Sequence, residues 1–155
     1  MLNDNQINRK RTPKSTTKMI INRRISLATE GLQPYIENWL RIRTSNENAL
    51  TISEYVLSLR REINPSQNYT KMQIRALVEL SKYSNQKPSG QLTSDDVLSF
   101  FNKFRKTEDP LHKWIGTYNL KHEILRQFFT WLNDPNTART FENTSRDFGK
   151  QVNVH

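Results

Sequence analysis

The most apolar helical pattern in the chain runs from Leu111 to Leu132. At about 100° per residue, apolar side chains fill one half of a helical wheel and polar side chains fill the other. The apolar half holds Leu120, Ile124, Leu125, Phe128, Phe129, Trp131 and Leu132. The pattern predicts an amphipathic helix over 117–132 that packs against the helices before it.

Three further segments repeat apolar residues at helical spacing, and they predict helices over 51–63, 70–84 and 94–105. Each opens on a candidate cap: Thr51-x-x-Glu54, Thr70-x-x-Gln73 and the run from Thr93 to Asp96. These helices and the one over 117–132 predict an all-α bundle of four core helices without a sheet. We expect four aromatic side chains to be buried in it: Phe101, Phe104, Phe128 and Trp131.

A shorter helix is expected from Pro34, a residue suited to the first helical position. Ile36, Trp39, Leu40 and Arg43 share one of its faces. We interpret residues 25–49 as this accessory helix with a linker, 50–134 as the core domain and 135–155 as a tail without a sustained period. The accessory helix either docks on the bundle or packs against a partner.

The net charge of +9 is unevenly distributed along the 155 residues. Residues 1–24 hold seven Lys or Arg against one acidic residue, whereas 67–134 hold ten against seven. The first segment is also rich in Asn and Thr, so we predict a disordered basic arm over 1–24. Its candidate phosphate contacts are Arg9, Lys10, Arg11 and Lys14. A solvated tail that merely keeps the chain soluble is an equal alternative.

A narrow basic stripe marks the predicted helix over 70–84. Lys71, Arg75 and Lys82 fall within about 40° of one another on its wheel, with Glu79 at the edge. Apolar residues occupy most of the remaining circumference. A nearly buried helix with one basic stripe is typical of a helix that faces phosphates, and we favour this over an ordinary solvated stripe.

The entrance to the helix over 117–132 gathers Lys113, Thr117, Tyr118, Asn119 and Lys121. Lys121 projects from the apolar half, where its stem either snorkels past the core or meets an anion at the helix N-terminus. We predict that the stripe and this entrance flank one groove. Tyr118 would pack between or beside them, and backbone N–H groups near Thr117 would be open to a phosphate.

The segment DPLHKWIGTYN, followed by LRQFFTWL, resembles the N-terminal core-binding domain of tyrosine recombinases of the phage-integrase type, in particular archaeal integrases. The likeness covers roughly Asn64 to Asp134. It implies a small orthogonal helical bundle of the SAM-like type that grips one side of the DNA. A separate C-terminal domain performs the chemistry in that family, and it follows a proline-rich basic linker that this sequence lacks.

The resemblance also implies which groups catalysis would need: an arginine pair, a Lys/His set around the phosphate and a tyrosine nucleophile. That order of motifs is absent here, and His122-x-x-x-Arg126 has the wrong spacing for the family's His-x-x-Arg. The three histidines are not at metal-ligand spacing, and there is no cysteine. We therefore expect no catalysis by this chain alone, no metal and no cofactor.

The sequence thus predicts a DNA-binding module for DNA integration and recombination, with double-stranded DNA as its partner and other recombinase subunits as further candidates. No small-molecule substrate or membrane is expected, since no apolar run approaches spanning length. The absence of cysteine suits an intracellular protein, here nucleoid-associated. Two alternatives stay open: a protein-interaction module exposing Tyr35, Ile36 and Trp39, or an idle remnant of a mobile element.

Overall fold

The computed structural model describes residues 13–105 and 114–137, and within these two stretches it contains helices and no strand. The predicted all-α class is therefore confirmed. In chain order the elements are α2 (Pro13–Ala28), α3 (Pro34–Ile42), α4 (Asn46–Glu62), α5 (Gln67–Tyr83), the 3₁₀ turn η1 (Ser89–Gln91), α6 (Ser94–Asn102) and α7 (Trp114–Leu132).

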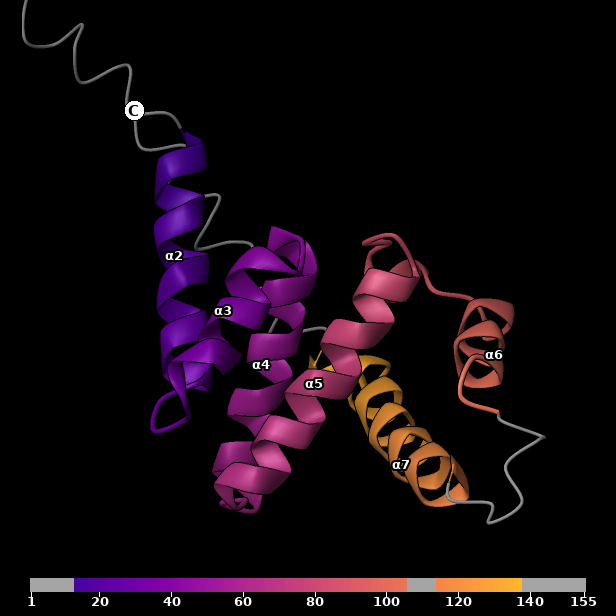
Figure 1. The fold of residues 1–155 in the computed structure, drawn as a ribbon. Coiled ribbons are helices and arrows are strands. Elements are labelled where there is room, and N and C mark those ends of the chain that lie inside the picture. Colours follow the sequence, from indigo (N-terminus) through magenta and orange to yellow (C-terminus); the bar gives the residue numbers. More distant parts are fainter. Residues whose placement is uncertain (1–12, 106–113, 138–155) are drawn as a thin grey trace, which may run out of the picture.

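The helices are arranged around α4 and α5, which cross near the middle of the molecule (Figure 1). Helix α2 packs along α4 at one edge, α3 lies against α2 and α5, and α7 contacts both α4 and α5. Helix α6 lies at the opposite edge and packs on α5. The four predicted core helices are thus present, but they form part of a larger bundle.

The main core lies between α2, α3, α4, α5 and α7. A smaller apolar cluster beneath α6 is formed by Leu80, Phe100, Phe101 and Leu125. Of the four aromatics expected to be buried, Phe101 and Phe128 are buried, whereas Phe104 and Trp131 are half-buried at the margins of the two clusters. The rings of Phe128 and Trp131 both contact that of Tyr55, at centroid distances of 5.3 and 5.4 Å.

Helix α2 corrects the prediction of a disordered arm to residue 24. The chain is helical from Pro13, and Ile21, Ile25 and Ala28 are buried in the main core at a spacing that places them on one helix face. The Arg24 guanidinium also binds the buried carboxylate of Glu54, with distances of 2.6 and 3.0 Å. Tertiary burial outweighs the polar composition of this segment, which alone favours disorder.

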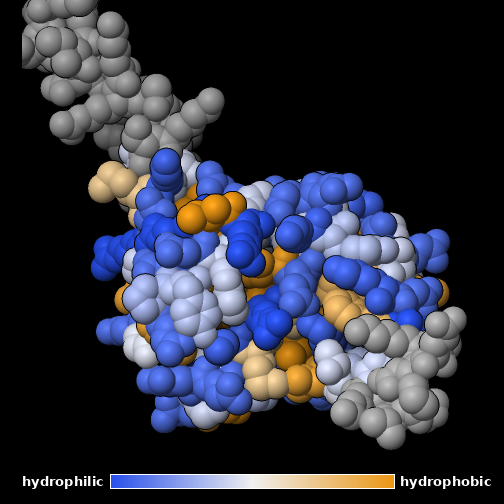
Figure 2. Space-filling view, viewed as in Figure 1, coloured by the Kyte–Doolittle hydropathy of each residue, from blue (hydrophilic) through white to orange (hydrophobic). Residues whose placement is uncertain are grey.

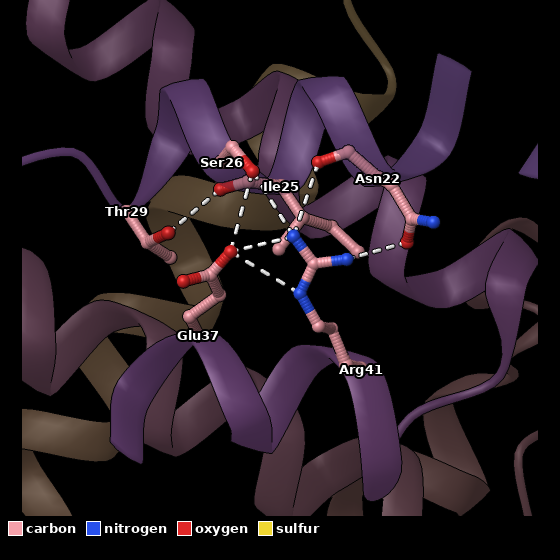
Figure 3. Close-up of polar contacts among 6 residues, drawn as sticks. All are labelled: Asn22, Ile25, Ser26, Thr29, Glu37 and Arg41. Carbon is pink, nitrogen blue, oxygen red and sulfur yellow. Dashed lines mark hydrogen bonds and ion pairs between the residues drawn. The ribbon is translucent and has the colours of Figure 1, made fainter. Parts of the chain in front are cut away.

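Polar contacts join α2 to α3 (Figure 3). Arg41 donates to the side-chain oxygen of Asn22 at 2.5 Å and to the Ser26 hydroxyl at 3.0 Å. It also pairs with Glu37, and this hydrogen bond lowers the pKa of the Glu37 carboxyl. Because Ile36 and Leu40 of α3 are buried in the same core as α2, the bundle continues across both boundaries predicted at residues 24 and 49.

Two helices begin one to two turns earlier than their capping patterns predict. Ser45 caps α4 and Ser66 caps α5, each accepting a backbone N–H three residues later. Thr51 and Thr70 instead lie inside these helices, where each hydroxyl donates to the carbonyl four residues before it. The cap of α6 is confirmed, because Thr93 and Asp96 form a reciprocal capping box.

A buried amide joins the start of α4 to the connection between α5 and α6. The Asn48 side-chain nitrogen donates to the Ser81 hydroxyl at 2.9 Å and to the Lys87 carbonyl at 3.0 Å. Its oxygen accepts the backbone N–H of Ser89 at 3.0 Å. The connection passes through residues with positive φ at Asn85 and Gln86. Asn48 therefore fixes the path by which the chain reaches α6.

Candidate nucleic-acid interface

The basic stripe predicted on residues 70–84 lies on the solvent side of α5. Arg75 has 63% of its side chain exposed, and Lys82 is exposed on the last turn. Lys71 is half-buried, with its ammonium 5.3 Å from the centroid of the Tyr35 ring on α3. Lys71 thus connects the basic stripe on α5 to the surface of α3.

Glu79 is the carboxylate at the centre of this surface. Its Oε1 accepts from Arg75 Nε at 3.3 Å, and its Oε2 pairs with the ammonium of Lys121 on α7. Only 11% of the Lys121 side chain is exposed, and its ammonium lies 4.7 Å from the Phe104 ring centroid. Lys121 is therefore held by a carboxylate from another helix. The sequence had suggested either a stem that snorkels past the core or an anion at the helix N-terminus, and neither interpretation included this partner.

A groove separates α5 from α7 in this region. It has a volume of about 390 Å³, with an apolar floor that includes Met72 and Ile124. Arg75, Thr117 and Lys121 border it. Figure 2 shows hydrophobic atoms recessed between α5 and α7 among hydrophilic side chains. The groove thus adjoins the start of α7 and one residue of the stripe, Arg75, whereas Lys71 and Lys82 do not border it. The binding of DNA by these residues stays a prediction.

A second cavity of about 310 Å³ lies between α3 and α5. Tyr35, Trp39 and Val78 line it together with three cations and one carboxylate: Arg43, Lys71, Arg75 and Glu79. Arg75 and Glu79 border both cavities, so the two hollows adjoin. Arg43 was missed as a site residue, although its place on one face with Trp39 was visible in the sequence.

Several predicted site residues lie elsewhere. Tyr118 packs on the α6 side, where its ring contacts Phe101 at a centroid distance of 5.4 Å and Trp114 at 5.8 Å. It therefore does not lie between the stripe and the entrance. Asn119 is exposed on α7 and borders neither cavity. Arg9, Lys10, Arg11 and Lys113 lie outside the described residues, as does the side chain of Lys14 on α2.

The helix N-terminus expected near Thr117 is also displaced. Helix α7 already includes Trp114, Ile115 and Gly116, so Thr117 is not its first residue. Thr117 contributes a side chain to the groove between α5 and α7 and not a free backbone N–H at a helix end.

A further cation near this groove, which the sequence did not single out, is Lys103. Its ammonium lies 5.5 Å from the ring centroid of Phe104, one of the residues that line the groove.

The exposed patch expected from Tyr35, Ile36 and Trp39 is smaller than predicted. Ile36 is 2% exposed because it faces the core, and Trp39 is partly buried against that core. Tyr35 remains 39% exposed. The spacing placed Ile36 and Trp39 on one face, whereas consecutive residues on a nine-residue helix point about 100° apart, so Tyr35 and Ile36 separate.

Within the described ranges, no three His, Cys, Asp or Glu side chains gather as metal ligands would. No helix there is long and apolar enough to cross a membrane. No family model, curated protein or solved structure matches the chain. The two adjoining hollows, with apolar floors and mostly cationic borders, suit an extended anion.

Proposed function

We propose that this chain is a DNA-binding module of the kind found as the core-binding domain of tyrosine recombinases, and that it contacts DNA through a basic face. The basic face comprises Arg43 at the C-cap of α3, Lys71, Arg75 and Lys82 on α5, and Lys121 on α7. The observation behind the proposal is that four of these cations border adjoining cavities whose described lining includes a single carboxylate, Glu79.

Phosphate contacts are what such a face can make. Lys and Arg side chains bind phosphate oxygens and release counterions from DNA, so affinity falls as salt rises. These contacts set position and orientation but carry little sequence information. We therefore expect weak affinity, roughly micromolar or poorer, that varies little with sequence.

The resemblance in sequence supports the same proposal from a separate direction. Its second part, LRQFFTWL, lies on α7 and includes Phe128 of the core, while Thr117 and Lys121 on the preceding turns border the groove. In the resembled domain the bundle grips DNA and a separate domain catalyses strand exchange. The proposal accordingly assigns DNA binding to this chain, in an intracellular setting of DNA integration and recombination, and assigns it no catalysis.

The test is a salt titration of duplex DNA binding by Lys71→Ala/Arg75→Ala, measured by fluorescence anisotropy. Two lost phosphate contacts should reduce the slope of log affinity against log salt by about two and weaken binding to all sequences alike. A matched control is Arg61→Ala/Arg126→Ala. It removes the same charge from exposed positions that border other cavities, at α4 and the second half of α7.

A third variant lacks residues 1–12, which hold Arg9, Lys10 and Arg11. We expect this arm to add affinity without adding selectivity. If the arm deletion abolishes binding while Lys71→Ala/Arg75→Ala behaves as the control does, the basic face is a solvated surface and the proposal fails.

A further inference from the structure

The cavity between α3 and α5 combines aromatic rings with cations. Tyr35 and Trp39 form an edge-to-face pair with ring centroids 5.2 Å apart. Val78 lies with them, and Arg43, Lys71 and Arg75 provide the positive border. Contacts to phosphate need no aromatic surface, so the rings are unexplained by duplex binding alone.

We infer that this cavity takes an unpaired base of DNA, which stacks on Tyr35 while the surrounding cations bind the flanking phosphates. The inference rests on the proposed function and names the form of DNA that the basic face prefers. A protein with this site binds single-stranded or gapped DNA better than it binds an intact duplex, in which every base is already stacked and paired.

Two observations and one general rule support an unpaired nucleotide as the occupant. Tyr35 is 39% exposed and lies outside the core cluster, so its ring is available to a ligand, whereas Trp39 behind it is partly packed. The positive border matches the phosphates of a strand that is continuous on both sides of the base. Stacking on an aromatic ring beside a basic groove is the general means by which proteins hold unpaired strands.

Lys71 has to move for a base to stack on Tyr35. Its ammonium now lies over the Tyr35 ring at 5.3 Å from the centroid, in the place that a base would take. A lysine stem is flexible, so the ammonium can move to a flanking phosphate as the base arrives. Glu79 borders the cavity as well and can accept a hydrogen bond from an exocyclic amino group of a base.

The experiment compares a thymidine oligomer with an abasic deoxyribose-phosphate oligomer of the same length and salt, using the full chain. The two have equal phosphate charge, so their affinity ratio isolates the bases. We expect the thymidine oligomer to bind roughly 5- to 150-fold more tightly, which corresponds to one stacked base. Tyr35→Ala should bring this ratio close to one and leave affinity for the abasic oligomer unchanged.

Two variants serve as controls. Tyr35→Phe keeps the ring and should keep the ratio. Tyr83→Ala removes a comparably exposed ring from α5 that does not border the cavity, and it should also keep the ratio. Far-ultraviolet circular dichroism checks that each variant is folded. If Tyr35→Phe loses the preference as Tyr35→Ala does, the ring is not the stacking surface and the inference is wrong.

The outcomes separate this inference from the proposal beneath it. A ratio of one for the unaltered protein, with duplex binding that still depends on Lys71 and Arg75, overturns the base site and leaves the DNA-binding function standing. Failure to bind duplex, thymidine oligomer and abasic oligomer alike overturns both. Equal loss for both oligomers in Tyr35→Ala assigns the residue a structural role and refutes the inference.

Discussion

Replacing Glu79 by glutamine should strengthen DNA binding and weaken the fold at the same time. Glu79 lies 3.3 Å from Arg75 Nε, so a phosphate that contacts Arg75 would come within roughly 7 Å of the carboxylate. Coulomb repulsion over that distance costs about 0.6 to 2.4 kcal/mol for an effective dielectric of about 80 to 20. Removing the charge should therefore tighten binding by about 3- to 50-fold, with salt reducing the gain toward the lower end.

Stability should change in the opposite direction. The Lys121 ammonium is mostly buried and pairs with the same carboxylate, so Glu79→Gln leaves it without a counter-charge. We expect a loss of about 1–3 kcal/mol in the free energy of unfolding, the range for a buried polar group that loses its partner. The assay combines denaturant unfolding with anisotropy titrations on duplex DNA between about 50 and 200 mM salt.

Glu123→Gln is the matched control on α7. It removes the same charge from an exposed pair with Arg126 that borders neither cavity of the basic face. Its stability should stay close to that of the unaltered protein, and its affinity should change less than that of Glu79→Gln. If Glu79→Gln lowers stability yet leaves DNA affinity at the control value, the basic face does not meet phosphate and the reasoning above is refuted.

Three further predictions concern the fold. Ile25→Ala removes a core side chain and should lower the free energy of unfolding by about 2–5 kcal/mol, whereas Ile42→Ala at a 77% exposed site should change it by no more than about 0.5 kcal/mol. If denaturant unfolding shows equally small effects for both variants, α2 is not part of the folded core. Burial raises the pKa of Tyr55, so the folded state holds the phenolic proton more tightly than the unfolded chain does. The free energy of unfolding should therefore fall as pH rises above about 10, and an unchanged unfolding midpoint there would contradict the burial of this phenol. The backbone N–H of Thr93 lowers the pKa of Asp96 to about 2, and NMR titration should show this midpoint moving upward in Thr93→Pro, which lacks that donor.

The helices over 70–84, 94–105 and 117–132 could be predicted because their apolar spacing is long and regular. The starts of α4 and α5 were less predictable, since Ser or Thr followed three residues later by Glu or Gln also occurs inside helices. Thr51 shows the ambiguity: its hydroxyl satisfies the Glu47 carbonyl within α4, while Ser45 provides the cap. A capping pattern specifies a helix start only where no earlier cap is available.

Helix α2 and the ion pair of Lys121 could not be predicted from local spacing, because both depend on residues distant in sequence. The pattern of Ile21, Ile25 and Ala28 was present, but a mostly polar helix forms only when another surface covers that stripe. Glu79 and Lys121 are 42 residues apart, and their contact arises from the crossing of α5 and α7. Charge counted along the chain cannot reveal such local neutralisation.

The Asn48 joint has a consequence for how this sequence can change over evolutionary time. One short amide, with two N–H donors and one acceptor oxygen, bonds four backbone and side-chain groups at once. Aspartate lacks the donors, leucine lacks both functions, and glutamine is longer by one methylene. Among relatives, position 48 should therefore vary less than Lys71 or Arg75. Such invariance would reflect the role of Asn48 in the connection to α6. A buried residue of this kind should not be taken for part of a binding surface.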